Sequence, residues 1–245
     1  MIDRSRWTVQ YMQRVLATDP IGYWMQDEKQ GAVSYDMVTA RSNGARNGTY
    51  TGVTLGQPGI GDGRTSPLFD GATDYMNGFS ASLAASINMS EISIMLWLKM
   101  FNVGVWTDGA RRDAFGIFIN GANYIYLSNI LNNRLEWKYT AGGIQSVVQV
   151  IVAETDWMAL FMTASLSAGG TGEMMAYRFV NGIGGQVGAT QVGLGVWAGA
   201  LPANNPVIGA FSIVPANPTY GYIAHGAIWD RPIMPATAAG LAVVE

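Results

Sequence analysis

The sequence contains no cysteine and only one histidine, His225, among its 245 residues. The lack of cysteine excludes disulfides, thiolate metal sites and a cysteine nucleophile together. A single histidine excludes a histidine-rich metal site, and any Ser-His-Asp triad would have to include His225. This residue lies in the middle of an apolar run, and no Gly-x-Ser-x-Gly motif accompanies it. We therefore expect a structural histidine, satisfied by a neighbouring backbone group.

Charged residues are also scarce. They make up 13% of the chain, against roughly 25% in an average soluble protein, and the formal net charge is -3. No basic run is present, so nucleic acid is not an expected partner. A surface with so few charges must carry many Ser, Thr, Asn, Gly and apolar atoms, which favours contact with other subunits. The composition therefore predicts a homo-oligomer.

Long apolar runs are missing as well. The longest, 92–105, is interrupted by Lys99 and Asn102 and is too short to span a bilayer. The N-terminus carries Asp3 and Arg4 and does not have the pattern of a signal peptide. We expect no membrane span and no secretory processing.

Glycine and aromatic residues are plentiful, with 31 Gly, 8 Trp and 11 Tyr, and they suit many short strands joined by tight turns. From Thr49 onward, apolar runs alternate with turn residues. Alternation is clearest where Ile92, Ile94, Leu96 and Leu98 share one face. The pattern predicts strands near 49–55, 67–70, 74–78, 91–101, 114–119, 123–128, 133–139, 144–152, 157–166, 173–181, 206–213 and 220–230.

Helices are expected only near the two ends of the sequence. The first eighteen residues read as a short amphipathic helix that Asp19 and Pro20 end, and residues 235–244 could form a short closing helix. The Gly-rich segment 182–199 is the expected long irregular excursion. We predict a helical arm over 1–20 and a single β-sandwich domain over 21–245.

Several segments occur in an order that matches a known family. They are 11–24 (YMQRVLATDPIGYW), Asn47-Gly48-Thr49-Tyr50, Leu68-Phe69-Asp70-Gly71, Ile92-Ser93-Ile94 with Trp97, Trp157-Met158-Ala159-Leu160, Val180-Asn181-Gly182, and Ile228 to Pro232. This order resembles the laminin-G-like/concanavalin-A-like lectin-glucanase jelly-roll domains of bacteriophage virion proteins. The resemblance implies an all-β sandwich of two antiparallel sheets, with the last strand returning beside the first.

Candidate ligand-binding residues are aromatic side chains that could stack on sugar rings, together with Asp108 in the most polar loop. The alternatives are core packing for the rings, and internal ion pairs in a solvated hairpin tip for the loop. The candidates are Trp106, Asp108, Tyr124, Tyr126, Trp137 and Tyr139.

A calcium site is a weaker possibility, with Asp70 and Asp74 as candidate ligands. Some laminin-G-like domains hold Ca²⁺ through loop carboxylates and carbonyl oxygens, but calcium needs about six to eight oxygens. Asp side chains more simply cap the turn between two strands. We predict no cofactor.

The acidic residues do not form a hydrolase motif. Glycoside hydrolases of related sandwich folds place two or three carboxylates on alternate positions of one strand. Glu154 and Asp156 share an i, i+2 spacing, but they flank a predicted turn where solvated acids are ordinary. We therefore predict that the chain is not an enzyme.

The prediction for function is a virion structural protein, a capsid decoration or tail-associated subunit assembled in the host cytoplasm. Trp7, Tyr11 and Leu16 of the N-terminal helix would contact other virion subunits. The first alternative is a carbohydrate-binding module with exposed Trp and Tyr, which would also suit host-surface attachment. The second is a polysaccharide-degrading enzyme with an unrecognised site.

Overall fold

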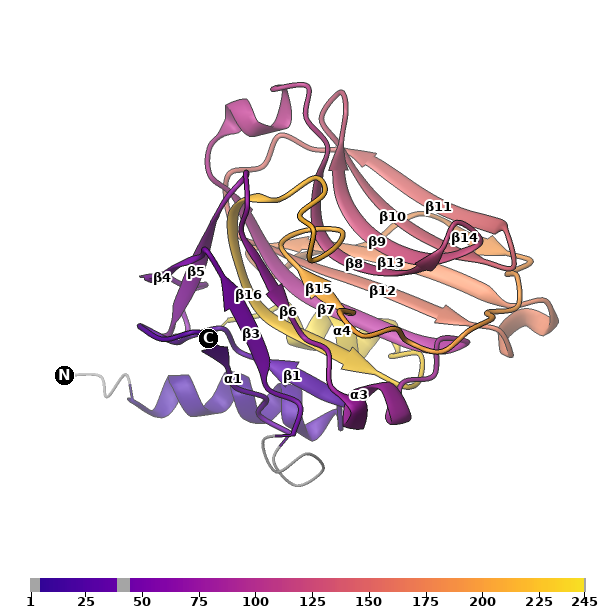
Figure 1. Cartoon of the computed structure of the whole chain (residues 1–245), viewed down its shortest axis with the longest axis horizontal. Helices are drawn as coiled ribbons and strands as arrows, with labels where there is room; N and C mark the ends of the chain where they lie inside the picture. The colour runs from indigo at the N-terminus through magenta and orange to yellow at the C-terminus, as the bar shows by residue number, and fades with distance from the viewer. Residues whose placement is uncertain (1–4, 39–44, 245) are drawn as a thin grey trace.

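Two antiparallel sheets packed face to face make up the body of the chain in a computed structural model (Figure 1). The structure describes residues 5–38 and 45–244, except for the side chains of residues 5–9. The predicted all-β, two-sheet sandwich is confirmed. The strand order of the first sheet is β14 (Ile183–Val192), β13 (Glu173–Val180), β12 (Met158–Ser165), β7 (Glu91–Met100), β16 (Tyr220–Trp229), β5 (Thr65–Asp70) and β4 (Thr54–Pro58), with β1 (Gly22–Trp24) also paired to β16.

The second sheet lies on the other side of a common core. Its order is β11 (Ile144–Ile151), β10 (Arg134–Ala141), β9 (Asn123–Ile130), β8 (Arg112–Asn120), β15 (Val207–Ile208), β6 (Tyr75–Asn77), β3 (Gly48–Thr51) and β2 (Val33–Ser34). The pairing of Gly22 with Ile228 brings the first strand beside the last, as the resemblance implies.

The inner core follows from the period-two alternation of the strands. Ile94 and Leu96 of β7 point between the sheets, where they join Leu160 of β12 and Trp137 of β10 in one buried cluster. The predicted shared face of Ile92, Ile94, Leu96 and Leu98 is confirmed. The opposite face of β7 is also buried, because other elements cover it.

A second core fills the outer side of the first sheet. The helices α1 (Ser5–Ala17) and α4 (Pro235–Leu241) contribute Tyr11 and Leu241 to it, and β7 contributes Trp97. The hydroxyl of Tyr11 donates to the carbonyl of Leu241 at 2.9 Å and accepts the Trp97 indole N–H at 2.6 Å. Figure 1 shows α1 and α4 lying along this sheet. Both helices expected near the ends of the sequence are present.

The three helix residues expected to contact other subunits have different surroundings. Tyr11 is fully buried in the second core, and Leu16 is half-buried against it. Both side chains therefore pack on the chain's own sheet. The side chain of Trp7 falls outside the described residues.

His225 is buried in the second core at a β-bulge of β16. Its backbone has φ +52°, and the register of β16 against β7 shifts between Ala224 and Ala227. Its Nδ1 lies 2.7 Å from the Tyr23 hydroxyl, and its Nε2 lies 3.1 Å from a carboxylate oxygen of Asp62. The ring is thus held by two side chains, whereas a backbone partner was expected.

The carboxylate of Asp62 has a pKa below its usual value. Burial alone would raise this pKa, but the hydrogen bond and the positive charge that His225 can carry outweigh burial. The Asp62–His225 pair therefore fixes the loop between β4 and β5 against the first sheet.

Three sequence expectations about strands are wrong. The predicted strand 206–213 is present only as β15 (Val207–Ile208), because the residues that follow form an irregular segment. The segment 182–199 is not wholly irregular, because Ile183–Val192 pairs with β13 as an edge strand. Its glycines weaken the strand signal without preventing the pairing. The range 49–55 is not one strand either: Gly52, at φ +81°, breaks it, so that β3 joins the second sheet and β4 joins the first.

One short helix was not expected from the sequence. Helix α3 (Ala81–Ser86) is capped at its N-terminus by Ser80, whose side chain accepts a hydrogen bond from the Leu83 N–H.

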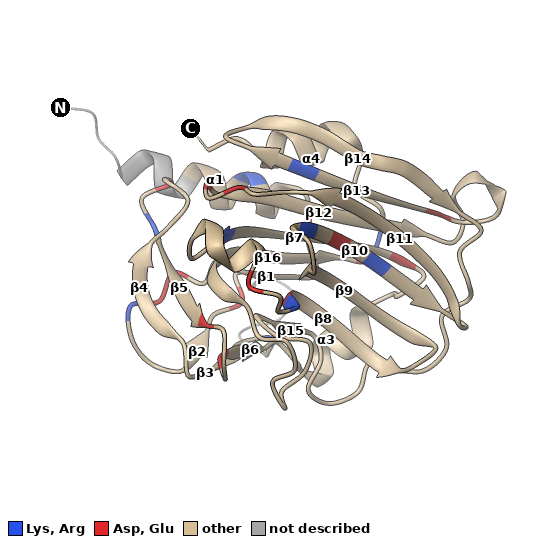
Figure 2. Cartoon of the chain, turned by 90° about the horizontal axis from the view of Figure 1, so that it is seen from above, with Lys and Arg blue, Asp and Glu red and all other residues tan. Residues whose placement is uncertain are grey.

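Within the described ranges, no helix is both long and apolar enough to cross a membrane. Figure 2 shows few charged residues on the two sheets, with blue and red segments following one another along β10.

Candidate ligand-binding face

The outward side chains of β8–β11 form ordered rows on the second sheet. Tyr124 of β9 lies between Phe118 and Thr140 in the strand register, and Tyr126 lies between Gly116 and Lys138. The rows continue onto β11, which adds polar amide side chains. We call this surface the tyrosine face; it consists of Phe118, Tyr124, Tyr126, Ser128, Glu136, Lys138, Thr140, Gln145, Val147 and Gln149.

The two tyrosines and two cations form the centre of the tyrosine face. The rings of Tyr124 and Tyr126 stack with centroids 5.8 Å apart and planes 11° apart. The Lys138 ammonium nitrogen lies 5.6 Å from the Tyr124 centroid, and the Arg111 guanidinium lies 4.0 Å from the Tyr126 centroid. These distances are within the range of cation–π attraction. The cations and rings therefore stabilise one another on this surface.

Exposure changes across the tyrosine face. Tyr126 is buried, Tyr124 and Lys138 are partly exposed, and Gln145 and Gln149 are exposed. Ligand contact is thus open to the Tyr124 ring, the Lys138 ammonium and the amides of β11.

The segment 209–219 borders the tyrosine face on its β8 side. The Phe211 ring meets the Phe118 ring edge to face, with centroids 5.2 Å apart. At Gly116, an added Cβ would lie only 2.7 Å from the Phe211 carbonyl oxygen. Glycine is required there because the backbone of the segment rests directly on β8.

A buried carboxylate connects this segment to the tyrosine face. Asp113 accepts hydrogen bonds from Arg111 at 2.8 Å and from Asn217 at 2.8 Å, and it also accepts from the Ser128 hydroxyl. Burial raises the Asp113 pKa above its usual value, although the charge of Arg111 and these hydrogen bonds oppose the rise. The network orients the Arg111 guanidinium over Tyr126.

Glu136 is the carboxylate in the centre of the rows. One of its oxygens accepts the Tyr126 hydroxyl at 2.6 Å, and the other accepts the Gln149 amide. Burial, followed by the hydrogen bond to Glu136, raises the pKa of Tyr126. Both oxygens of Glu136 therefore orient neighbouring side chains of the face.

Of the aromatic candidates, the structure brings Tyr124 and Tyr126 together and places the other three in the core. Trp106, Trp137 and Tyr139 have exposures of 2%, 0% and 0%. The Trp106 indole donates to the Glu154 carbonyl at 2.7 Å, and the Tyr139 hydroxyl donates to the Met89 carbonyl at 3.0 Å. Core packing, the alternative for these rings, accounts for their positions.

Asp108 follows the 3-10 helix η1 (Val103–Trp106) and pairs with the Arg112 guanidinium at 2.6 Å. The same guanidinium donates to the carbonyl of Gly71 at 2.9 Å. This loop therefore contains the internal ion pair that was the alternative to ligand contact.

The two candidate calcium ligands close a turn. One oxygen of Asp70 accepts the backbone N–H groups of Ala72 at 2.7 Å and Thr73 at 2.9 Å, and Asp74 accepts that of Asp70 at 2.9 Å. Although burial acts in the opposite sense, these backbone hydrogen bonds hold the pKa of Asp70 below its usual value. In the described part of the chain, no three His, Cys, Asp or Glu side chains gather as a metal site.

The sequence predictions did not include Lys138, Gln145, Gln149 or Phe211. The first three could have been found, because the Gly142-Gly143 turn sets the register of β10 against β11 and alternation then gives their face. Phe211 could not, because its position depends on how a long irregular segment folds back over β8.

The comparisons with known proteins show the fold. No family model matches the sequence, and no curated protein matches it. Among solved structures, domain 4 of AbnA, a GH43 extracellular arabinanase from Geobacillus stearothermophilus in complex with arabinotriose, is similar at TM-score 0.62 and 14% identity, over 91% of this chain and 98% of that one.

Two further solved structures contain the same sandwich within longer chains. The botulinum neurotoxin serotype D binding domain is similar at TM-score 0.63 and 14% identity, over 91% of this chain and 50% of that chain. A Trypanosoma rangeli sialidase is similar at TM-score 0.60 and 10% identity, over 91% of this chain and 32% of that chain. At these identities the likeness shows the β-sandwich fold alone.

Proposed function

We propose that the chain is a non-catalytic carbohydrate-binding domain, and that an oligosaccharide binds on the tyrosine face. The observation that carries this proposal is the partly exposed Tyr124 ring beside Lys138 and the exposed amides of Gln145 and Gln149. A sugar presents apolar C–H groups and many hydroxyls. An aromatic ring beside amides and an ammonium group supplies both kinds of contact.

The dimensions of the tyrosine face suit more than one sugar unit. Neighbouring strands of a sheet are about 4.8 Å apart, so that the rows from β8 to β11 span about 14 Å. Contacts for a ligand are distributed along this distance, and Tyr124 and Gln145 lie at different strands of one row. A chain of sugars can therefore contact several strands at once.

The carboxylates of the face support a binding role without hydrolysis. Glycosidases place two carboxyl groups about 5–10 Å apart on either side of the scissile bond. Here both oxygens of Glu136 are engaged by neighbouring side chains, and Asp113 is buried against Arg111. Neither carboxylate is presented as a free acid or nucleophile.

The test is binding to a panel of soluble polysaccharides, measured by affinity electrophoresis and calorimetry. We expect Tyr124→Ala and Lys138→Ala each to weaken binding about tenfold, which corresponds to about 1.4 kcal/mol. Tyr35→Ala is the matched control, because Tyr35 is 57% exposed and directly follows β2, at the other end of the second sheet. Absence of binding to every polysaccharide, or an equal loss in the control, would contradict the proposal.

A second candidate function is subunit assembly through the edge strands β11 and β14. Neither strand contains a charged residue, and Ile183 and Val192 of β14 are 82% and 66% exposed. An edge strand with unpaired backbone groups and apolar side chains is suited to association with another subunit. A homo-oligomer, including one within a virion, would use this surface.

Sedimentation analysis tests the assembly candidate. We expect Ile183→Lys with Val192→Lys to shift an oligomer to monomer. Val214→Lys is the control, because Val214 is 80% exposed in the segment 209–219 and belongs to neither edge strand. A wild-type chain that stays monomeric at high concentration, and does not copurify with virus particles, would count against assembly.

A further inference from the structure

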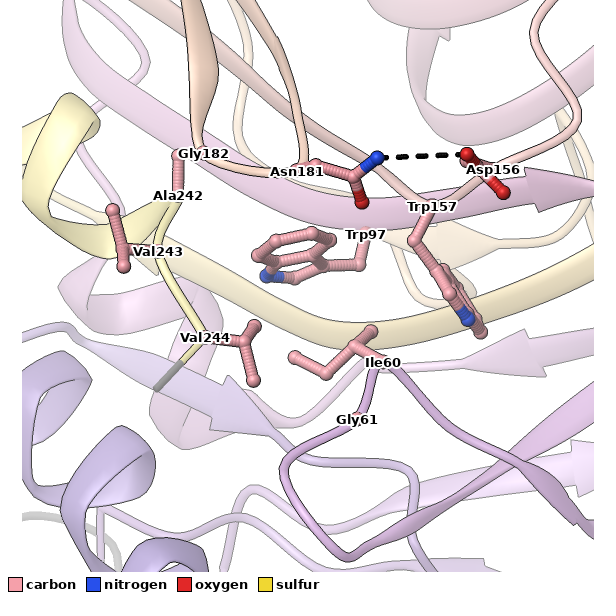
Figure 3. A pocket seen from close by; sticks show the side chains of 10 residues that line it. All are labelled: Ile60, Gly61, Trp97, Asp156, Trp157, Asn181, Gly182, Ala242, Val243 and Val244. Atoms are coloured by element: carbon pink, nitrogen blue, oxygen red, sulfur yellow. Dashed lines mark hydrogen bonds between the residues drawn. The ribbon is translucent and has the colours of Figure 1, made fainter.

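A cavity of about 320 Å³ opens on the outer side of the first sheet, on the opposite side of the sandwich from the tyrosine face (Figure 3). It lies where three connections and one tail meet: the β4–β5 loop with Ile60, the segment before β12, the β13–β14 turn, and the tail after α4 with Val244. Ligand sites occupy about 300–1,000 Å³, so the size of this cavity suits a ligand with a single ring.

The base and sides of the cavity are apolar. The Trp97 indole lies in the middle of the labelled side chains in Figure 3, between Trp157 and the aliphatic Val244. Its N–H donates to the Tyr11 hydroxyl at 2.6 Å, which fixes the ring in one orientation. Trp97 is buried beneath the cavity and makes its base rigid, while the partly exposed Trp157 ring supplies the indole surface to which the apolar face of a flat ring can pack.

The upper side of the cavity in Figure 3 is polar. The Asn181 amide donates to the Asp156 carboxylate at 3.5 Å, the outer limit of a hydrogen bond, and both residues are exposed. A bond this weak can be exchanged for better ones to a ligand. One hydroxyl can donate to Asp156 and accept from Asn181, and its neighbour on the same ring can use the remaining carboxylate oxygen.

The backbone holds these two polar groups in place before a ligand arrives. Asn181 has φ +51°, a left-handed conformation that the Asn181-Gly182 turn requires. The Asp156 N–H donates to the Glu154 carboxylate at 3.0 Å. Among the described residues that line the cavity, none is Lys or Arg, so an anionic ligand would meet an uncompensated carboxylate.

We propose that this cavity is a second ligand site, which binds one neutral sugar ring with its apolar face on the Trp157 indole and its neighbouring hydroxyls on Asp156 and Asn181. The inference does not depend on the tyrosine face. Because the two surfaces lie on opposite sides of the sandwich, one molecule can occupy both at once.

The test is fluorine NMR of the full chain labelled with 5-fluorotryptophan, with the Trp157 resonance assigned from Trp157→Phe. Methyl glycosides of neutral hexoses and pentoses are titrated into the millimolar range. We expect a saturable shift of the Trp157 resonance with at least one of them. Asp156→Asn and Asn181→Gly should each weaken this binding about tenfold, while glucuronate should bind less tightly than glucose.

Asn132→Gly is the matched control for Asn181→Gly. Asn132 is also exposed and left-handed, with φ +65°, but it lies in the β9–β10 turn. The control should bind the sugar as the unmodified chain does, and so should Tyr124→Ala. The proposal would be overturned if no neutral sugar shifted the Trp157 resonance, or if Asp156→Asn left the shift unchanged. It would also be overturned if the cation tetramethylammonium shifted the resonance and no neutral sugar did.

Failure of the cavity and failure of the tyrosine face are distinguishable. Loss of polysaccharide binding with an intact response of Trp157 to simple sugars would contradict only the tyrosine face. Polysaccharide binding that depends on Tyr124, with no response of Trp157, would contradict only the cavity.

Discussion

The two outer faces of the sandwich have opposite environments. The first sheet is covered by α1 and α4, so that Trp97 and Phe161 are buried on its outer side. In the described part of the chain no helix lies over β9–β11 of the second sheet, and the outward residues there include the exposed Gln145 and Gln149. A sheet with two covered faces reads as a continuous apolar run, as β7 and β12 do. A sheet with one open face keeps polar side chains available for a ligand.

The largest loss of stability is expected for a substitution on the covered face. Tyr11→Ala should lower the free energy of unfolding by about 3–5 kcal/mol, because it removes a buried ring and the hydrogen bonds of its hydroxyl to Leu241 and Trp97. Urea unfolding followed by circular dichroism measures this change. Tyr124→Ala on the open face should cost less than about 1 kcal/mol. Equal losses would break the comparison between the two faces.

The next effect depends on pH. Asp62→Asn should lower the free energy of unfolding by about 1–3 kcal/mol at neutral pH, because it weakens the partner of a buried His225. The folded state lowers the Asp62 pKa, so this contribution is present above the unfolded pKa and is lost as pH falls through the folded one. The free energies of unfolding of the unmodified chain and of Asp62→Asn, measured by urea titration, should converge in acid. A constant difference down to the lowest pH would show that Asp62 stabilises the loop by packing alone.

A smaller loss of stability is expected at Arg111, whose guanidinium lies over Tyr126. Arg111→Lys should cost about 1 kcal/mol, because lysine cannot both stack flat on Tyr126 and present two N–H groups to Asp113. Thermal unfolding measures the loss. An unchanged melting temperature would mean that Asp113 holds this segment through Asn217 and Ser128 without Arg111.

The smallest effect concerns an outward side chain. Lys138→Gln should change the free energy of unfolding by no more than about 0.5 kcal/mol, since the side chain is partly exposed and its attraction to Tyr124 is screened by water. The same urea titration measures it. A loss comparable with that of Tyr11→Ala would show that the open face contributes to folding as much as the covered one.

The sequence was informative where a local pattern determines structure. Alternation in 91–100 identified the inner face of β7, and the expected helices formed near residues 5–17 and 235–241. It was less informative where one residue type has two uses. Trp106 and Trp137 belong to a residue type that occurs both in sugar-binding sites and in cores. Only tertiary packing decides that both are in the core. Strand β14 was missed because glycine-rich strands lack the apolar alternation on which strand prediction depends.

The candidate sites also show that a local sequence pattern does not report which distant residues come together. Tyr124 and Tyr126 were found from sequence because they are two residues apart on one strand. The cavity combines residues from five separate segments, with Trp97 and Val244 almost 150 positions apart. The sequence pattern around Asp156 indicates only an ordinary solvated acid beside a turn. Its proximity to Asn181 depends on the pairing of β12 with β13, and no short-range pattern reports it.

The central position of β16 has a consequence for how the chain is made. β16 pairs with β1, β5 and β7, and its residues 220–229 leave the ribosome long after those of all three partners. Until then, β1 lacks its strand partner and Tyr11 lacks the Leu241 carbonyl. Such long-range pairing slows folding and prolongs exposure of apolar surface. Nascent chains stalled before residue 220 should therefore bind chaperones, and release of a few tens of further residues should end that binding.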